Sequence, residues 1–280
     1  MNKDSGLSPI SMTSLPYVHG YSDREDQRLR DQSQILAELL HQDTRYPPGS
    51  RVLEAGCGVG AQTVLLAGNS PQARFTCVDV SVESLKLAET AVRRAGISNV
   101  AFRAGDLFQL PFDADSFDHV FLCFVLEHLE DPLRALRELK RVLKPAGTLT
   151  VIEGDHGSTF FHPRSDAAWK TIQCLIDLQS AVGGDALIGR QLHPLLCHAG
   201  FANVSVSPRF VYADSSRPDW VEGFTRNTYI AMVQGIRERA LEAGLIDGAT
   251  WERGLADLKA AAGPEGTFCY TFFKAVAVKE

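Results

Sequence analysis

The sequence predicts an α/β fold built on a parallel sheet. Short apolar runs alternate from residue 51 onward with longer segments whose apolar residues recur every three or four positions. Strands separated by helices in this way are typical of βαβ units, whose strands run parallel. A glycine-rich stretch also joins the first strand to the first helix, the place where such folds bind ligands. The 280 residues suffice for one large domain or for a core domain with a cap.

The N-terminal part divides into two segments. We expect residues 1–16 to be flexible and residues 17–46 to form a helical lid. Ser22 and Glu25 have the spacing of a capping box, and leucines at helical spacing follow them. The "PPG" of residues 47–49 separates this lid from a core predicted over residues 47–160.

The core elements follow in order. We expect strands over residues 51–55, 73–80, 99–106, 117–124 and 148–153, and helices over residues 61–68, 81–96 and 131–147. Ser81 is the expected N-cap of the second helix, and Gly96 should end it. Asp131 should cap the third helix, with Pro132 at its first position. A loop should follow the fifth strand.

The remaining residues, 161–280, are expected to complete the sheet and to carry a helical cap. Helical patterns cover residues 165–182 and 189–201, strand patterns cover 203–213 and 266–279, and helical patterns return between these two strands. A connection of that length is too long for a loop. We therefore expect a cap, over about 161–200 and 214–263, that forms a substrate pocket.

Composition and charge narrow the class of partner. The formal net charge is −6 and the isoelectric point about 5.8, which favours neither nucleic acid nor an anionic membrane as a partner. The first 22 residues lack an apolar signal-peptide core, and no long apolar run indicates a membrane span. The six cysteines include no C-x-x-C pair. We expect a cytoplasmic protein with free thiols and no bound metal.

The glycine-rich stretch "VLEAGCGVGAQT" is the first functional signal. Gly56, Gly58 and Gly60 allow a sharp turn and close approach to a ligand. The loop alone also fits a dinucleotide fingerprint. Glu54 before the glycines would repel a pyrophosphate but suits a cofactor with an ammonium and a sulfonium group. Asp79 and Asp106, at the ends of the next two strands, suit a ribose and an adenine amino group, which together favour S-adenosylmethionine over NAD.

These motifs also carry a family resemblance. "VLEAGCGVG", "VDVS", "GDLFQLPFDADSFDHVFLCFVLEHLEDP" and "LKRVLKPAGTLTV" together resemble class I S-adenosylmethionine-dependent methyltransferases. The branch is the small-molecule, methyltransferase 11-like group that contains the ubiquinone and sterol enzymes. The resemblance covers residues 17–152. It implies a Rossmann-like, seven-stranded, mostly parallel sheet with helices on both faces and an antiparallel final strand. "EGDHGS" and "GTFCYTFFK" are similar to a bacterial and archaeal subgroup.

The resemblance also implies where S-adenosylmethionine binds. The glycine loop should line its methionine part, the end of the second strand should hold the ribose, and the end of the third should flank the adenine. The segment after the fourth strand should face the methyl group, and a tyrosine from the lid should close over the cofactor. The implied cofactor residues are Tyr21, Glu54, Gly56, Cys57, Gly58, Asp79, Val80, Asp106, Leu107 and Phe124.

Candidates for catalysis follow the fourth and fifth strands, where ligands sit in open α/β sheets. Methyl transfer needs a general base only when the nucleophile must lose a proton. Glu127 and His128 in "CFVLEHLEDP" and the adjacent pair Asp155 and His156 in "VIEGDHGSTFF" are the candidates. For Glu127 and His128 the alternative is to cap the following helix or to position the cofactor. For the second pair it is a capping carboxylate with a surface imidazole. The glycines beside the pair should leave room for a bound molecule.

Aromatic residues of the expected cap indicate a small aromatic substrate. The candidate substrate residues are Phe160, Trp169, Arg190, Phe224 and Tyr229. C-methylation of an indole in a tryptophan-derived cyclic dipeptide is one concrete version, and O- or N-methylation of another metabolite is the alternative. An NAD-dependent oxidoreductase and a non-catalytic cofactor-binding protein are the rival classes. The expected partner is a small molecule, and a homodimer is left open.

Overall fold

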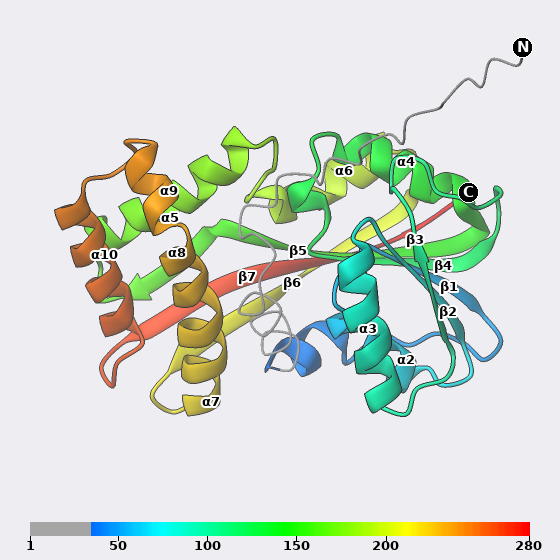
Figure 1. Cartoon of the computed structure of the whole chain (residues 1–280), viewed down its shortest axis with the longest axis horizontal. Helices are drawn as coiled ribbons and strands as arrows, with labels where there is room; N and C mark the ends of the chain where they lie inside the picture. The colour runs from blue at the N-terminus through cyan, green and yellow to red at the C-terminus, as the bar shows by residue number, and fades with distance from the viewer. Residues whose placement is uncertain (1–34) are drawn as a thin grey trace, which may run out of the picture.

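The structure, a computed structural model, describes residues 35–280, which form a seven-stranded sheet in the order β3-β2-β1-β4-β5-β7-β6 (Figure 1). Strands β1 to β5 pair in parallel, and β7 is antiparallel to both of its neighbours, β5 and β6. The predicted Rossmann-like sheet with an antiparallel final strand is confirmed. The strands are β1 (Arg51–Ala55), β2 (Arg74–Asp79), β3 (Val100–Ala104), β4 (Phe117–Cys123), β5 (Leu143–His162), β6 (Ala202–Asp214) and β7 (Thr267–Val278).

Helices cover both faces of the sheet. They are α2 (Ala61–Asn69), α3 (Val82–Arg94), α4 (Pro132–Val142), α5 (Asp166–Ala181), α6 (Leu192–His198), α7 (Pro218–Trp220), α8 (Ala231–Gly235), α9 (Arg237–Glu242) and α10 (Gly248–Ala261), with 3-10 turns η1 (Leu126–His128) and η2 (Ile188–Gln191) and a π-helix η3 (Val221–Ile230). Residues 35–41 are also helical. Among residues 35–280, none of these helices is both long and apolar enough to cross a membrane.

Buried apolar side chains form two clusters, one on each face of the sheet. This explains why the strand sequences are continuously apolar. Neighbours along a strand point to opposite faces, so Val52 joins one cluster and Leu53 the other. The cluster that contains Leu53 includes residues of α4 and α6, and the cluster that contains Val52 includes residues of α5 and α10. A sheet that is covered on both faces exposes its ligand-binding residues only at the strand ends.

The predicted helix ends agree with the observed capping. The Ser81 hydroxyl accepts a hydrogen bond from the backbone N–H of Ser84, and Gly96 follows α3 with a φ of +70°. Asp131 accepts from the N–H of Arg134 at the start of α4, directly before Pro132. These signals act within one helical turn, which is why the sequence reveals them.

The largest departure from the expected elements is the length of β5. We expected a strand over 148–153 and then a loop, but β5 continues to His162. Residues Thr148 to Asp155 pair with β7, and after an irregularity the pairing resumes at Phe160. The hydrogen bonds come from a strand more than a hundred residues later, so no local pattern announces them. Asp155 and His156 therefore belong to a strand and not to a loop.

The C-terminal helices lie at the end of the molecule away from β1, β2 and β3 (Figure 1). Helix α5 packs against α10, and both lie in the part of the molecule where β5 ends (Figure 1). Helix α6 instead contacts α4 and β6, so this part of the expected cap segment covers the sheet. The helical pattern over residues 218–244 becomes α7, η3, α8 and α9. Its ten-residue π-helix was not predicted.

A buried lysine ties the helix of residues 35–41 to the sheet. The ammonium of Lys274, on β7, donates to the backbone oxygen of Leu40 (3.1 Å), the carboxylate of Asp43 (2.6 Å) and the hydroxyl of Thr44 (2.5 Å). Asp43 also forms an ion pair with Arg209 of β6. Burial lowers the pKa of Lys274, while Asp43 opposes that shift. These contacts hold residues 40–44, directly after the helix of residues 35–41, against β7.

We expect the substitution Lys274→Met to lower the free energy of unfolding by about 1–3 kcal/mol, because it leaves three acceptors without their donor. Urea denaturation measures the change. The matched control is Lys144→Met, whose ammonium forms a half-exposed pair with Asp118 and should matter by less than about 1 kcal/mol. Equal stability of the two variants would show that the Lys274 cluster contributes no net stability.

Candidate active site

The glycine loop between β1 and α2 has the backbone conformation that its sequence predicts. Gly56, Gly58 and Gly60 have φ values of +76°, +50° and +78°. A Cβ on Gly56 would lie 2.6 Å from a methyl of Val125, and one on Gly60 would lie 2.9 Å from the Cα of Ala88. A Cβ on Gly58 would meet nothing within 4 Å. Packing therefore requires glycine at 56 and 60, while Gly58 borders open space.

Asp79, at the end of β2, holds the glycine loop in place. One of its carboxylate oxygens accepts from the N–H of Gly58 (2.8 Å), and the other accepts from the N–H of Ser81 (2.9 Å). Burial raises the pKa of Asp79, although these N–H donors oppose the shift. A carboxylate has about four acceptor sites. Asp79 therefore keeps acceptor capacity for a ligand beside the loop.

Glu54, at the end of β1, is a buried carboxyl group with partners of its own. Its Oε2 accepts from the hydroxyl of Thr63 (2.6 Å) and from the thiol of Cys77 (3.2 Å). Burial raises the pKa of Glu54 to about 7. A nearby positive charge would stabilise its ionised form. This carboxyl group thus suits a cationic ligand at the glycine loop.

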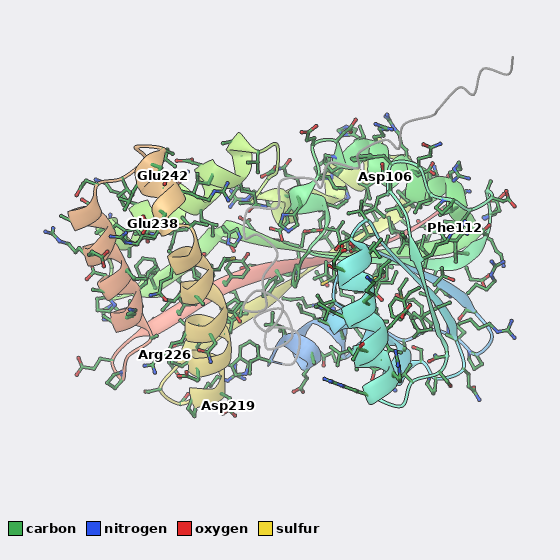
Figure 2. All side chains as sticks on the ribbon, in the orientation of Figure 1. Asp106, Phe112, Asp219, Arg226, Glu238 and Glu242 are labelled. Atoms are coloured by element: carbon green, nitrogen blue, oxygen red, sulfur yellow. The ribbon has the colours of Figure 1, made fainter. Side chains whose placement is uncertain are left out.

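The other predicted cofactor residues lie at the same strand ends, with one exception. Cys57 is buried within the loop, Val80 follows β2, and Leu107 is buried behind the exposed Asp106. One oxygen of Asp106 accepts from the N–H of Phe108 (2.8 Å). Figure 2 shows Asp106 at the end of the molecule opposite to Glu238 and Glu242 of α9. The exception, Tyr21, lies outside the described residues.

The segment after β4 lies against the glycine loop. Phe124 has a φ of +59°, which is unusual for a residue with a side chain, and its N–H donates to the oxygen of Ile152 on β5. The ring of Phe124 packs 5.3 Å from that of Phe272 on β7. Val125 is the residue that contacts Gly56. The β4 exit is therefore the link between the glycine loop and the aromatic residues of β7.

His156 lies in a buried aromatic cluster. Its ring centroid is 5.8 Å from that of Tyr229 in η3 and 5.6 Å from that of Tyr270 on β7. The hydroxyl of Tyr270 is 3.5 Å from Nδ1 of His156, and the hydroxyl of Tyr229 is 2.8 Å from that of Thr159. Phe224 packs 5.7 Å from Tyr270. The predicted residues His156, Phe224 and Tyr229 therefore come together.

The Asp155 side chain points away from this cluster and forms an ion pair with Arg190, which was a predicted substrate residue. The guanidinium of Arg190, from η2, donates twice to the Asp155 carboxylate, at 2.7 Å in each contact. The ion pair raises the pKa of Arg190. Neighbouring strand residues face opposite sides of the sheet, so Asp155 and His156 do not act as a contiguous dyad. Asp155 is thus engaged by Arg190, whereas His156 contacts the aromatic cluster.

The two glycines of "EGDHG" make room for protein groups. A Cβ on Gly154 would collide with the hydroxyl of Tyr270, and one on Gly157 would lie 2.6 Å from Nη2 of Arg190. We expected these glycines to leave space for a bound molecule. The space beside Gly154 is instead filled by the side chain of Tyr270, and the space beside Gly157 is filled by the side chain of Arg190.

The remaining candidates are dispersed. Glu127, on η1, accepts from the amide of Gln179 (3.3 Å) and lies 3.5 Å from Nε2 of His128. Phe160 is 54% exposed and stacks on Phe210 of the edge strand β6. Trp169 packs against Phe161, 6.0 Å away. The structure thus separates Phe160 and Trp169 from the contacts that join His156 to its aromatic neighbours.

Sequence reasoning gave no role to Glu153 or Tyr270, which are both buried at the site. A carboxylate that interrupts the apolar run "TVIEG" was a signal for Glu153. Tyr270 carried no comparable signal, because it is one of several aromatic residues in an alternating strand.

Comparisons with known proteins agree with this geometry. Residues 53–151 match the protein family described as "Methyltransferase domain". An uncharacterized 37.1 kDa protein in a transposon of Streptomyces fradiae is 34% identical over 234 residues, which are 82% of this chain and 61% of that protein. The chain thus spans about three fifths of that relative's length. The matched segment contains the end of β1, the glycine loop, Asp79, Asp106 and β4, so the predicted cofactor residues from Glu54 to Phe124 lie in the part of the chain that is similar to this family.

Two solved structures resemble the whole described fold. The [4+2]-cyclase SpnF is 26% identical, with a TM-score of 0.55 over 89% of this chain and 81% of that one. A phosphoethanolamine N-methyltransferase of Haemonchus contortus, solved with S-adenosylhomocysteine, is 18% identical, with a TM-score of 0.55 over 88% of this chain and 52% of that one. The second likeness concerns the fold alone. The chain therefore has the fold of class I methyltransferases.

Proposed function

We propose that the chain is an S-adenosylmethionine-dependent methyltransferase that acts on a small aromatic molecule. The observation that supports the proposal best is the set of groups around the glycine loop. Asp79 holds that loop from β2, Glu54 lies behind it, and Gly58 borders open space. A carboxylate pair beside a loop of positive φ suits a ligand that carries cationic groups and ribose hydroxyls.

The residues present fit S-adenosylmethionine. Asp79 has free acceptor positions for ribose hydroxyls, and Asp106 is exposed at the end of β3, where an adenine amino group could donate to it. The buried carboxyl group of Glu54 would stabilise the cationic methionine part of the cofactor, whose positive charge would in turn favour the ionised form of Glu54. When bound, the cofactor supplies a methyl group on a positively charged sulfur, which is already activated for in-line transfer.

The chain's own contribution to the reaction is orientation and removal of a proton. The aromatic rings of Phe224, Tyr229 and Tyr270 form an apolar surrounding with few polar groups, which suits a flat aromatic acceptor. His156 is the group that would take a proton from an N–H or O–H acceptor, or from an indole N–H as the ring carbon attacks. C-methylation of the indole in a tryptophan-derived cyclic dipeptide is the concrete version that we propose to test first.

Cofactor titration tests this proposal. S-adenosylhomocysteine should raise the melting temperature of the protein, and NADH should not, since the Glu54 carboxyl disfavours a pyrophosphate. A panel of indoles, phenols and aromatic amines, with release of S-adenosylhomocysteine as the readout, then identifies the acceptor. Stabilisation by NADH alone would overturn the proposal in favour of an oxidoreductase.

A second candidate is a cyclase that uses the same fold without transferring a methyl group. The likeness to the [4+2]-cyclase SpnF, which covers most of both chains, favours it, and one fold often serves several reactions. The aromatic cluster around His156 would then hold an apolar molecule in a folded conformation. Binding of S-adenosylhomocysteine without methyl transfer to any acceptor of the panel is the result that this candidate predicts.

A further inference from the structure

Glu153 is a completely buried carboxyl group in the middle of β5, directly after Ile152, which pairs with the last residue of β4. Its Oε1 accepts hydrogen bonds from two successive backbone N–H groups, those of Val125 (3.0 Å) and Leu126 (2.8 Å). Its Oε2 is buried and has no hydrogen-bond partner among residues 35–280. A buried polar atom without a partner is costly, so this arrangement calls for a physical explanation.

The two N–H contacts make Glu153 the cap of the η1 turn. Val125, the residue at the N-cap position directly before this turn, supplies no side-chain cap. The segment held in this way contains Phe124 with its positive φ and Val125, whose methyl group would touch any side chain on Gly56. Glu153 therefore connects the end of β5, through residues 124–126, to the glycine loop.

The surroundings determine which form of this carboxyl group is stable. The charged group with the largest influence on Glu153 is Glu127, which is also an acid. A negative charge on a neighbouring carboxyl group disfavours ionisation of a buried acid. Unlike Glu153, Glu127 is partly exposed, and the amide of Gln179 and the imidazole of His128 lie beside it.

Burial and the neighbouring Glu127 raise the pKa of Glu153 well above its usual range, although the backbone N–H groups oppose the shift. Other titratable groups at this end of the sheet are Cys123 of β4 and Tyr270 of β7, and burial raises the pKa of each of them as well. Both of these groups therefore remain neutral. Burial also raises the pKa of Glu54 on β1, to about 7, so Glu54 titrates in the same pH range. Its titration is common to wild type and to a Glu153 variant, and a comparison of the two proteins isolates the contribution of Glu153.

We propose that Glu153 is a positioning residue that works as a neutral carboxylic acid: Oε1 holds residues 124–126 against Gly56, and the proton keeps a second negative charge out of this buried end of the sheet. The inference rests on the proposed function insofar as Gly56 belongs to the cofactor site. An acid whose pKa is higher in the folded state binds its proton more tightly there, so its stabilising contribution is complete below about pH 4 and is lost as the pH rises through the folded-state pKa.

The test compares wild type with Glu153→Gln, which keeps an acceptor oxygen but has no charge to gain. At about pH 6 the two proteins should bind S-adenosylhomocysteine with dissociation constants within about threefold of each other, because both side chains are neutral. Between about pH 6 and pH 9 the wild type should lose about tenfold more affinity than Glu153→Gln. The melting temperature of the unliganded wild type should also fall by about 2–4 °C more than that of the variant.

Two further variants separate positioning from general effects of substitution. Glu153→Ala removes the cap and should weaken binding at both pH values. The matched control Glu265→Gln changes an exposed glutamate and should follow wild type throughout. If Glu153→Gln binds S-adenosylhomocysteine more than about tenfold more weakly than wild type at pH 6, an anionic Glu153 is needed. If the two proteins have identical pH profiles, the proton of Glu153 has no role. Either result overturns the inference.

The same experiment distinguishes this inference from the proposed function. If wild type binds no S-adenosylhomocysteine at either pH, the proposed function fails. The melting temperatures of the unliganded proteins still report on Glu153, because the other titrating groups are common to wild type and Glu153→Gln and cancel in the difference between them. A wild type that loses no more stability than Glu153→Gln at alkaline pH would overturn the inference even if the cofactor binds.

Discussion

Replacing Asp79 by alanine should weaken the binding of S-adenosylhomocysteine by about 10²–10³-fold. The substitution removes the proposed acceptor for the ribose hydroxyls, and hydrogen bonds to a charged group contribute about 1.5–3 kcal/mol each. It also removes the acceptor of the Gly58 N–H, so that the glycine loop loses its anchor to β2. Isothermal titration calorimetry measures the change in the dissociation constant.

The matched control for Asp79 is Asp166→Ala, which removes an aspartate whose side chain is 85% exposed at the start of α5. It should bind the ligand as wild type does. Circular dichroism should show that Asp79→Ala is folded, because the loss of one partly satisfied carboxylate does not remove a core side chain. Unchanged affinity in folded Asp79→Ala would remove the ribose role and with it the main support for the cofactor assignment.

Replacing His156 by alanine should lower the turnover of an N–H or O–H acceptor by about 10²–10⁴-fold, the usual contribution of a general base. Binding of S-adenosylhomocysteine should change little, since His156 contacts Tyr229 and Tyr270 rather than the glycine loop. The measurement is the single-turnover rate of methyl transfer with the acceptor that the panel identifies. Replacing Tyr270 by phenylalanine should have a smaller effect, because it removes only a hydroxyl 3.5 Å from the imidazole.

The exposed His198 of α6 provides the control, and His198→Ala should retain wild-type turnover. If His156→Ala keeps a rate within about threefold of wild type, proton removal by His156 is wrong, and either Glu127 or an acceptor that needs no base becomes the better explanation. Loss of cofactor affinity in His156→Ala would instead indicate that its buried ring supports the structure of the site.

Much of the fold and of the cofactor site could be predicted because the signals are local. Ser81 caps α3 by accepting from an N–H only three residues away, and Gly58 needs only its own backbone conformation. The seven-stranded sheet with an antiparallel final strand was implied by the family resemblance, and the structure confirms it. The substrate end was less accessible to prediction: the expected loop after β5 is a strand, and Phe160 is exposed.

The sequence by itself determined the glycine loop, the carboxyl groups at the ends of the first strands and the helix caps, because each depends on neighbouring residues. Only the tertiary structure decided which partners the polar residues near Glu153 have, and therefore what chemistry these residues can perform. Arg190 neutralises Asp155 across 35 residues, and Lys274 reaches Asp43 across 231. Burial, which no local pattern fixes, decides which acids keep their protons. The environment of the polar residues in β5 is therefore set by residues that are distant in the sequence.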